Sequence, residues 1–127
     1  MHIIESPLRV ATGKTKYFVL NLNQYRNAHY FTLNNAKKEH KRLIIEQVNK
    51  LPAFSKIIIH YMLFPKNKRM CDLDNVISIH AKFFQDVLVE CKKIPEDTYE
   101  YIIGSTQEFG EINKTNPHVQ IKIEVIE

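Results

Sequence analysis

The fold is decided by the stretch Ser55-Lys-Ile-Ile-Ile-His-Tyr-Met-Leu-Phe64, together with the run from Asn75 to Cys91 that follows it after a basic loop. β-Branched and aromatic residues fill the first stretch, which predicts a strand. The second run carries apolar residues at helical spacing, at positions 76, 77, 80, 83, 84, 87, 88 and 91. A strand followed by an amphipathic helix predicts a helix packed on a β-sheet.

Weaker patterns on either side complete the predicted domain. On the amino-terminal side, residues 17–22 form a strand, residues 3–4 add a short strand that forms a hairpin with it through residues 11–13, and residues 23–33 form a polar loop. A helix then runs from Asn34 or Asn35 to about Lys50. On the carboxy-terminal side, residues 99–106 and 118–126 form two strands. The order β-α-β-α-β-β predicts a single α+β domain over residues 1–127, with one mixed β-sheet and two main helices.

Length and composition fit one globular domain with a polyanionic partner. The 127 residues are 44% hydrophobic and 25% charged, and no apolar run is long enough for a membrane span. The amino terminus does not resemble a signal peptide. Cys71 and Cys91 lack a CxxC spacing, so we expect reduced thiols in the cytoplasm. The net charge of +4 favours nucleic acid, because bound cations release counterions from the phosphate backbone.

Two motifs that resemble known sites are incomplete. Gly13-Lys14-Thr15 resembles the end of a phosphate-binding P-loop, but position 8 is Leu where that loop needs glycine. The stretch from Asp72 to Asn75 resembles the start of an EF-hand calcium loop, but Ile77 stands where that loop needs glycine. Neither an NTPase nor an EF-hand is therefore expected.

Asp72 and Asp74 are the most informative pair in the sequence. Carboxylates two residues apart on an extended chain point to the same side, where they can hold a hard divalent cation. Lys66, Lys68 and Arg69 directly precede the pair, which suits a site where a phosphodiester meets a metal ion. The alternative is structural: Asp74 caps the following helix, and Asp72 interacts favourably with the helix dipole.

The acidic pair belongs to a longer pattern. This pattern consists of Arg69-Met-Cys-Asp-Leu-Asp-Asn75, an apolar helix that ends in Gln85-Asp-Val-Leu88, and the segment Ile94-Pro-Glu-Asp97. It resembles the RusA family of Holliday junction resolvases, which is common in phages and prophages. Residues 20–27 also resemble the polar loop after the first strand of phage members. The resemblance covers residues 17–106, approximately, and its central motif is specific.

This resemblance implies a metal-dependent endonuclease. It implies that Asp72, Asp74 and Asp97 are the catalytic carboxylates that hold Mg²⁺, with Mn²⁺ as a substitute ion. Glu96 replaces Asp97 if the alignment is one residue out. The implied reaction is the resolution of four-way DNA junctions by paired symmetric nicks, in recombination and repair. The implied enzyme is a homodimer that acts in the cytoplasm of a bacterial host cell.

The resemblance is incomplete at one catalytic position. Known members carry a lysine four residues after the second aspartate, where this chain has Ser78. Counted back from the acid at the helix end, Asp86, the family lysine corresponds to Lys82. The two counts differ because this helix is four residues longer, about one turn. Lys82 is therefore predicted as the catalytic cation, with a surface role for its long side chain as the alternative.

Further residues are predicted to bind DNA or to support the site. Arg26 and His29 lie in a segment with two tyrosines, which suits contact with unpaired bases. Asn75 matches the family's asparagine and is expected to support the acidic pair. The basic loop is expected to contact phosphates through its three cations, Lys66, Lys68 and Arg69.

Two other functions stay open at this point. A nucleic-acid-binding module without enzymatic activity would use the same basic clusters, and it would show salt-sensitive binding without metal-dependent cleavage. A different Mg²⁺-dependent phosphodiesterase would act on other branched DNA or on RNA. A synthetic four-way junction incubated with Mg²⁺ discriminates among these functions.

Overall fold

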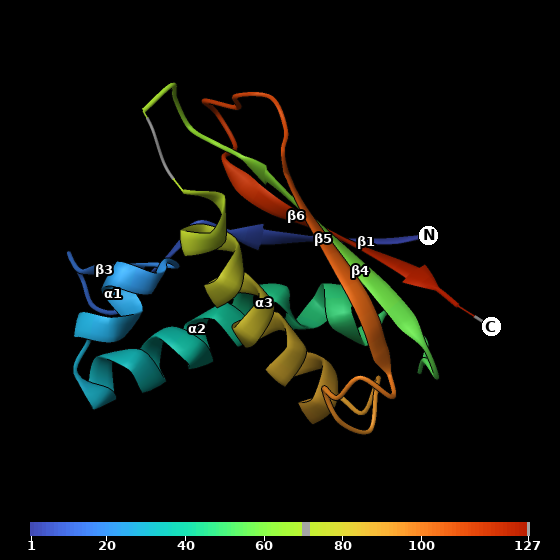
Figure 1. Ribbon diagram of the computed structural model, residues 1–127. Coiled ribbons are helices and arrows are strands. Elements are labelled where there is room, and N and C mark those ends of the chain that lie inside the picture. Colours follow the sequence, from blue (N-terminus) through green and yellow to red (C-terminus); the bar gives the residue numbers. More distant parts are fainter. Residues whose placement is uncertain (70–71, 127) are drawn as a thin grey trace.

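A computed structural model describes residues 1–69 and 72–126 and confirms the predicted α+β fold with one mixed β-sheet (Figure 1). The sheet has the strand order β1-β6-β4-β5, with β1 spanning His2–Pro7, β4 Ile57–Phe64, β5 Ile102–Phe109 and β6 His118–Val125. β6 runs antiparallel to both β1 and β4, whereas β4 and β5 are parallel. A parallel pair needs a crossover connection, which the helix between β4 and β5 supplies.

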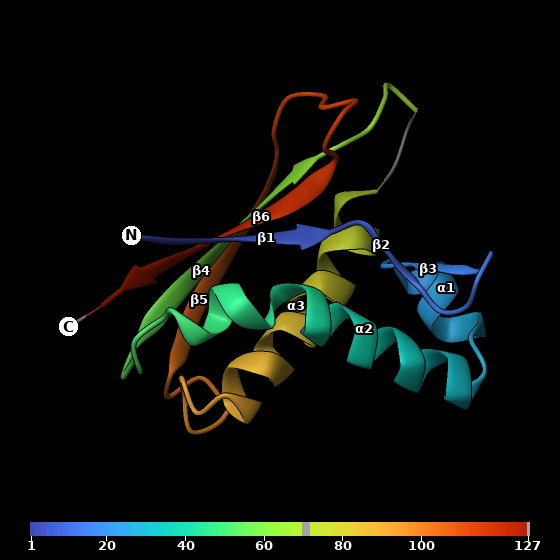
Figure 2. The ribbon, with the colours of Figure 1, turned by 180° about the vertical axis from the view of Figure 1, so that it is seen from behind.

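Two long helices, α2 (Tyr30–Asn49) and α3 (Leu73–Glu90), cover one face of this sheet (Figure 1 and Figure 2). Buried and half-buried residues alternate along β4, because successive side chains of a strand point to opposite faces. The buried side chains of β4 join one core cluster with apolar residues of α3, including Phe84 and Leu88. The domain therefore has a helical layer on a sheet, and α3 is the crossover between two parallel strands.

A second, smaller core involves the same two helices. β2 (Arg9–Ala11) and β3 (Tyr17–Val19) form a two-stranded sheet, and α1 (Leu22–Asn27) follows it. These elements pack with α2 and α3 around a second set of buried side chains, Val10, Phe18, Leu20, Ala36, Ile79 and Phe83. Because α3 contributes to both cores, it fixes the small sheet and α1 relative to the large sheet.

The predicted pairing of the first strand is wrong. β1 pairs with β6, from His2 opposite Ile123 to Pro7 opposite His118, and not with residues 17–22. β3 forms its hairpin with β2 instead. In the turn between them, the backbone N–H of Thr12 donates to the carbonyl of Lys16 at 2.9 Å. The two short segments before residue 12 are therefore separate strands in different sheets.

The polar loop predicted over residues 23–33 is also wrong, because most of this segment is helical. Asn21 is the N-cap of α1, where its side chain accepts from the backbone N–H of Gln24 at 2.8 Å. His29 is the N-cap of α2, where Nδ1 accepts from the backbone N–H of Phe31 at 3.3 Å. α2 thus begins at Tyr30, before the predicted asparagine caps. Polar residues here start helices, as is typical of N-caps.

A buried polar cluster joins β1 to both long helices. The hydroxyl of Ser6 lies 2.8 Å from Nε2 of His40 on α2 and 2.7 Å from Nδ1 of His80 on α3, and all three side chains are fully buried. The hydroxyl carries one proton, so it donates to one imidazole and accepts from the other. Burial lowers the pKa of His40 to about 4. Burial, with a smaller effect of His40, also lowers the pKa of His80 well below its ordinary value.

Within residues 1–69 and 72–126, no helix combines the length and hydropathy that a membrane crossing requires. Cys91, just after α3, is a half-buried free thiol. Cys71 lies outside the described residues.

Candidate metal and nucleic-acid site

Asp72 and Asp74 lie at the amino terminus of α3, exposed to solvent. Asp72 is the N-cap residue, and its Oδ1 accepts from the backbone N–H of Asp74 at 3.1 Å. The helix therefore starts two residues earlier than predicted, and its cap is Asp72 rather than Asp74. Both carboxylates suit this position, because the amino-terminal end of a helix dipole stabilises negative charge. The capping contact uses Oδ1 of Asp72 and does not involve the carboxylate of Asp74.

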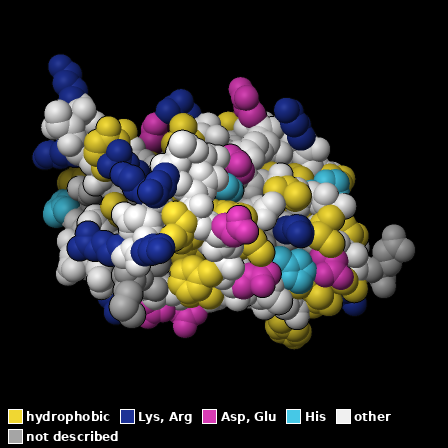
Figure 3. All heavy atoms as spheres, turned by 90° about the horizontal axis from the view of Figure 1, so that it is seen from above, with side chains coloured by type: hydrophobic (Ala, Val, Ile, Leu, Met, Phe, Trp, Pro, Cys, Tyr) yellow, Lys and Arg dark blue, Asp and Glu magenta, His cyan; other side chains and the backbone are white. Residues whose placement is uncertain are grey.

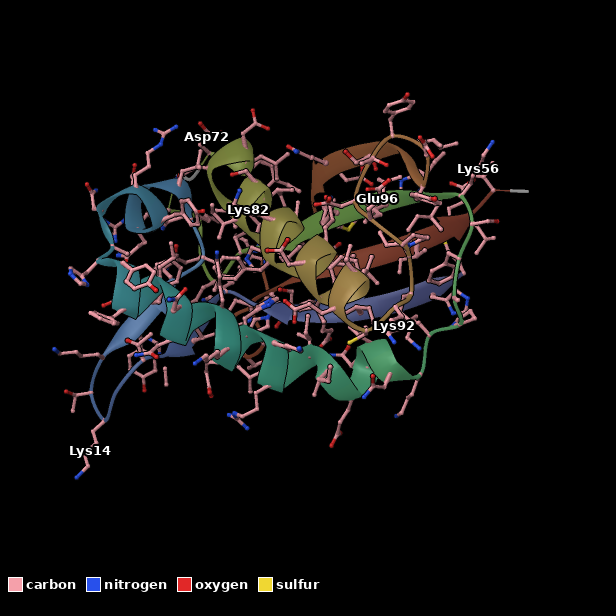
Figure 4. All side chains as sticks on the ribbon, turned by 90° about the horizontal axis from the view of Figure 1, so that it is seen from below. Lys14, Lys56, Asp72, Lys82, Lys92 and Glu96 are labelled. Carbon is pink, nitrogen blue, oxygen red and sulfur yellow. The ribbon has the colours of Figure 1, made fainter. Side chains whose placement is uncertain are left out.

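Asp97 lies in the connection from α3 to β5, where it is exposed. Its neighbour Glu96 is labelled in Figure 4, away from Asp72 at the start of α3. The strand predicted over residues 99–106 begins later than expected, at Ile102, so Asp97 lies five residues before it. The carbonyl of Thr98 accepts from the N–H groups of both Tyr101 and Ile102 at 3.0 Å, and this turn delays β5 until Ile102.

The surroundings of Asp86 locate Asp97 more closely. The pKa of Asp86 is raised, mainly by burial. The positive charges of Lys37 and Lys82 lower this pKa, whereas the negative charge of Asp97 raises it further. Asp97 therefore lies close to Asp86. Asp86 follows Asp74 by 12 residues of one helix, which is a rise of about 18 Å. Asp97 is thus near the carboxy-terminal half of α3, whereas the acidic pair is at its start.

The carboxylates fit a metal site only in part. Among the described residues, no group of three or more His, Cys, Asp or Glu side chains is arranged to hold an ion. The three-carboxylate set of Asp72, Asp74 and Asp97 is therefore not assembled within one chain. Asp72 has an extended backbone, but Asp74 lies in the first turn of α3, so the pair is not on an extended chain as predicted. Two carboxylates at one helix terminus can still supply oxygen ligands to Mg²⁺, which fills its other positions with water and substrate phosphate. The carboxylates therefore fit a site in which two of them bind the ion and the substrate supplies further ligands. They do not fit a preformed site with three carboxylates.

The basic loop (residues 65–69) directly follows β4. Lys66, Lys68 and Arg69 are all exposed, and the backbone N–H of Arg69 donates to Oδ1 of Asn67 at 2.9 Å. The adjoining segment, residues 110–117, braces the start of the loop through the N–H of Asn113, which donates to the carbonyl of residue 65 at 2.8 Å. The three cations therefore project from a loop with local hydrogen bonds of its own.

Gly110 is required where this bracing segment meets β4. A Cβ at Gly110 would lie 2.6 Å from the ring of Phe64, which is closer than real Cβ contacts allow. The N–H of Gly110 also donates to the carbonyl of Leu63 at 2.8 Å. The close approach holds the bracing segment against the end of β4 and so against the start of the basic loop.

A cavity of about 340 Å³ opens between the basic loop and the chain that leads into α1. Lys66 and Arg69 contribute to one side of it, and Leu20 and Asn21 contribute to the other. Arg26 is exposed in the last turn of α1, and His29 is exposed at the cap of α2. Figure 3 shows that Lys and Arg side chains gather on the side of the molecule that carries α1 and the basic loop. The predicted DNA-binding residues thus occupy one end of the domain.

Asn75 and Lys82 connect α3 to α1. Oδ1 of Asn75 accepts from the backbone N–H of Leu22 at 2.9 Å, which fixes the start of α1 beside the acidic pair. Nζ of Lys82 lies 5.7 Å from the centre of the Tyr25 ring, within the range of a cation–π contact. Lys82 follows Asp74 by eight residues, or about 12 Å along the helix. Tyr25 is a contact that the sequence did not predict, because α1 itself was not predicted.

The sequence matches no model of a protein family, and no curated protein matches it significantly. The resemblance to the RusA family therefore rests on the motif around Asp72 and Asp74 and on its flanking segments.

The RusA resemblance implies that Lys82 is a catalytic cation, and a test of this implication is Lys82→Ala, which should then lower the rate of junction cleavage about tenfold in single-turnover reactions with saturating enzyme and Mg²⁺. A hydrogen bond to a charged group contributes about 1.5 kcal/mol or more, and about 1.4 kcal/mol is a factor of ten. Lys92→Ala, which removes an exposed lysine just beyond α3, should leave the rate unchanged. Equal rates for Lys82→Ala and the wild type would leave Lys68 or Arg69 as the catalytic cation.

Proposed function

We propose that this chain is a Mg²⁺-dependent endonuclease that cuts branched DNA and resolves four-way junctions. The proposal rests on one observation: the exposed pair Asp72 and Asp74 begins α3, and the basic loop precedes it in the chain with three exposed cations. Carboxylates and cations beside one another suit a phosphodiester that meets a metal ion. The RusA resemblance, which lies in this same segment, supports the same activity.

The proposed roles follow from where the side chains lie. Lys66, Lys68 and Arg69 bind phosphates near the cut and so set the register of the strand. Asp72 and Asp74 hold the ion, and the hydrogen bond between them keeps the first carboxylate over the helix terminus. When bound, Mg²⁺ supplies Lewis acidity and neutralises negative charge at the scissile phosphate.

The proposal includes a homodimer. Symmetric nicks in two strands of a junction require two active sites related by a two-fold axis, and a C2 dimer of this chain supplies them. We place this activity in the cytoplasm of a bacterial host, where branched DNA arises during recombination and repair. Mn²⁺ is expected to replace Mg²⁺, because both accept carboxylate and water oxygens.

The test is cleavage of a synthetic four-way junction with Mg²⁺, Mn²⁺ or EDTA. We expect cleavage with either ion and none in EDTA. Paired nicks at symmetric positions would support the homodimer, whereas single nicks at unrelated positions would contradict it. Linear duplex and single-stranded RNA serve as substrate controls, and faster cleavage of RNA would reject a DNA enzyme.

One observation favours a second candidate, a DNA-binding protein without enzymatic activity. The third carboxylate is missing from the acidic pair within one chain, and Asp72 has a structural role as the helix cap. This candidate predicts that the junction is bound with a strong dependence on salt but is left intact with both metal ions. The same junction experiment therefore separates the two candidates.

A further inference from the structure

One segment of the chain carries all of the protein's positive net charge. Residues 6–38, the acid-free segment, contain six Lys or Arg residues and no Asp or Glu. The rest of the chain carries 12 basic and 14 acidic residues. The segment includes β2, β3, α1 and the first turns of α2. Its cations are Arg9, Lys14, Lys16, Arg26, Lys37 and Lys38.

Three aromatic rings gather on the surface of this segment at the start of α2. Tyr30 and Phe31 are each 67% exposed, and His29 is exposed beside them. The ring of His29 stacks on that of Phe31 with centres 5.4 Å apart, and the ring of Tyr30 lies 5.1 Å from the same ring. This aromatic platform, residues 29–31, presents ring surface to solvent from a segment of the chain that contains no Asp or Glu. Exposed rings among cations are the usual means of binding unpaired bases.

A cavity of about 380 Å³ adjoins the aromatic platform. Rings of Tyr17 and His29 contribute to its lining. The guanidinium of Arg9 lies 4.2 Å from the centre of the Tyr17 ring, so a positive charge is fixed near the cavity. Amide side chains, which can donate to and accept from base edges, also line it, from Asn23, Gln24 and Asn27.

We propose that the aromatic platform and the adjoining cavity bind unpaired bases of single-stranded DNA. The charge of the acid-free segment attracts the backbone, and the rings and amides favour bases that are not already stacked in a duplex. Because Asn75 ties α1 to α3, a strand bound here lies at the end of the domain that carries the acidic pair. The choice of DNA over RNA rests on the proposed function, whereas the binding itself requires no cleavage.

Binding is tested by fluorescence anisotropy of a labelled 20-nucleotide oligo-dT in EDTA, at 50 and 200 mM salt. Wild-type protein should bind oligo-dT more tightly than a blunt duplex, and salt should weaken binding strongly. The double variant Tyr30→Ala/Phe31→Ala should bind oligo-dT at least about tenfold more weakly. Leu43→Ala removes another exposed apolar side chain of α2, and it should leave the affinity for oligo-dT unchanged. Both substitutions are at exposed positions, so thermal melts should remain close to wild type.

Phe31→Trp gives a direct readout of stacking. The chain contains no tryptophan, so this variant has a single indole fluorophore at the platform. We expect wild-type affinity for oligo-dT together with quenching of the tryptophan fluorescence on binding, because the indole stacks on a base. Affinity without quenching would overturn the proposed stacking.

The remaining outcomes also decide the proposal. Unchanged affinity in the double alanine variant, or no binding of oligo-dT, would overturn it, even if junction cleavage is intact. Tighter binding of oligo-U than of oligo-dT would reject DNA as the partner. A dimer that becomes monomeric in the double alanine variant would make the platform a contact between two copies of the chain. Stacking on oligo-dT without junction cleavage would support this inference and reject the proposed function alone.

Discussion

Asp72→Asn is expected to lower junction cleavage at least about 100-fold while leaving the affinity for the junction unchanged. The substitution removes one of two carboxylate donors, a loss of several kcal/mol of charge stabilisation, and each 1.4 kcal/mol or so is a factor of ten in rate. Asparagine is about as good an N-cap as aspartate, so α3 keeps its start. The phosphate contacts of the basic loop are also untouched. Cleavage is measured under single-turnover conditions with Mg²⁺, and binding is measured in EDTA.

Three further variants show whether this loss is specific to the acidic pair. Asp74→Asn should match Asp72→Asn, and Glu100→Gln, which removes an exposed carboxylate elsewhere, should keep wild-type activity. Because Asp97 lies away from the acidic pair within one chain, the cleavage rate of Asp97→Asn should stay within about tenfold of the wild-type rate. This corresponds to a change of less than about 1.4 kcal/mol in the activation free energy. A loss as large as that of Asp72→Asn would contradict this and would indicate that Asp97 acts in the other protomer. Mixing Asp72→Asn with Asp97→Asn protomers would then restore activity.

Acidification from pH 6.5 to 4 is expected to lower the free energy of unfolding by about 3 kcal/mol through His40, since the slope is about 1.4 kcal/mol per pH unit. Above pH 6.5 the imidazole is neutral in both the folded and the unfolded chain, so stability does not depend on its titration. Between pH 6.5 and about 4, His40 is protonated in the unfolded chain but stays neutral in the folded chain, because its pKa in the fold is about 4. Protonation therefore favours the unfolded chain in this range. His80, whose pKa is also lowered by burial, adds to the loss. Ser6 and Phe83 also face His40, and neither carries a charge.

The double variant His40→Gln/His80→Asn separates this effect from general acid unfolding. A glutamine amide can reach the position of Nε2 at residue 40, and an asparagine amide that of Nδ1 at residue 80, so both contacts with Ser6 can be kept without titration. The urea midpoint of the double variant should vary less between pH 6.5 and 4.5 than that of the wild type. His29→Gln, at an exposed position, should retain the wild-type dependence. Parallel curves for the double variant and the wild type would contradict the assignment.

The elements with strong local periodicity were predictable from the sequence. The strand predicted over 55–64 is β4, Ile57–Phe64, and the helix predicted over 75–91 is α3, Leu73–Glu90. α1 was not predictable in this way, because it is only six residues long and none of its residues is buried. The partner of β1 was not predictable either, since no local pattern records that His2 lies opposite Ile123.

In the candidate site, too, the local features were predictable from the sequence and the tertiary ones were not. The adjacency of the basic loop to Asp72 and Asp74 is a property of the chain itself, so the sequence reveals it. The position of Asp97 depends on the length of α3 and on the turn at Thr98, which are set by packing and by backbone hydrogen bonds. The aromatic platform was predicted only in part. The sequence suggested that His29 and its neighbouring tyrosines suit contact with unpaired bases, but not that Phe31 joins them, because the rings are brought together by the helix start at Tyr30 in a segment that was expected to be a loop.

The pairing of β1 with β6 also constrains how the protein folds as it is made. The ribosome releases β1 well before β6, so the strand that holds Ser6 emerges long before the strand it pairs with. The hairpin of β2 and β3 and the helix α2 contain mostly local contacts and can form early, whereas the large sheet must wait for its central strand. Until β6 is made, both edges of β1 are unpaired and can associate with other chains. Completion of the sheet is therefore a late event that closes a long loop, and contacts of this kind slow folding.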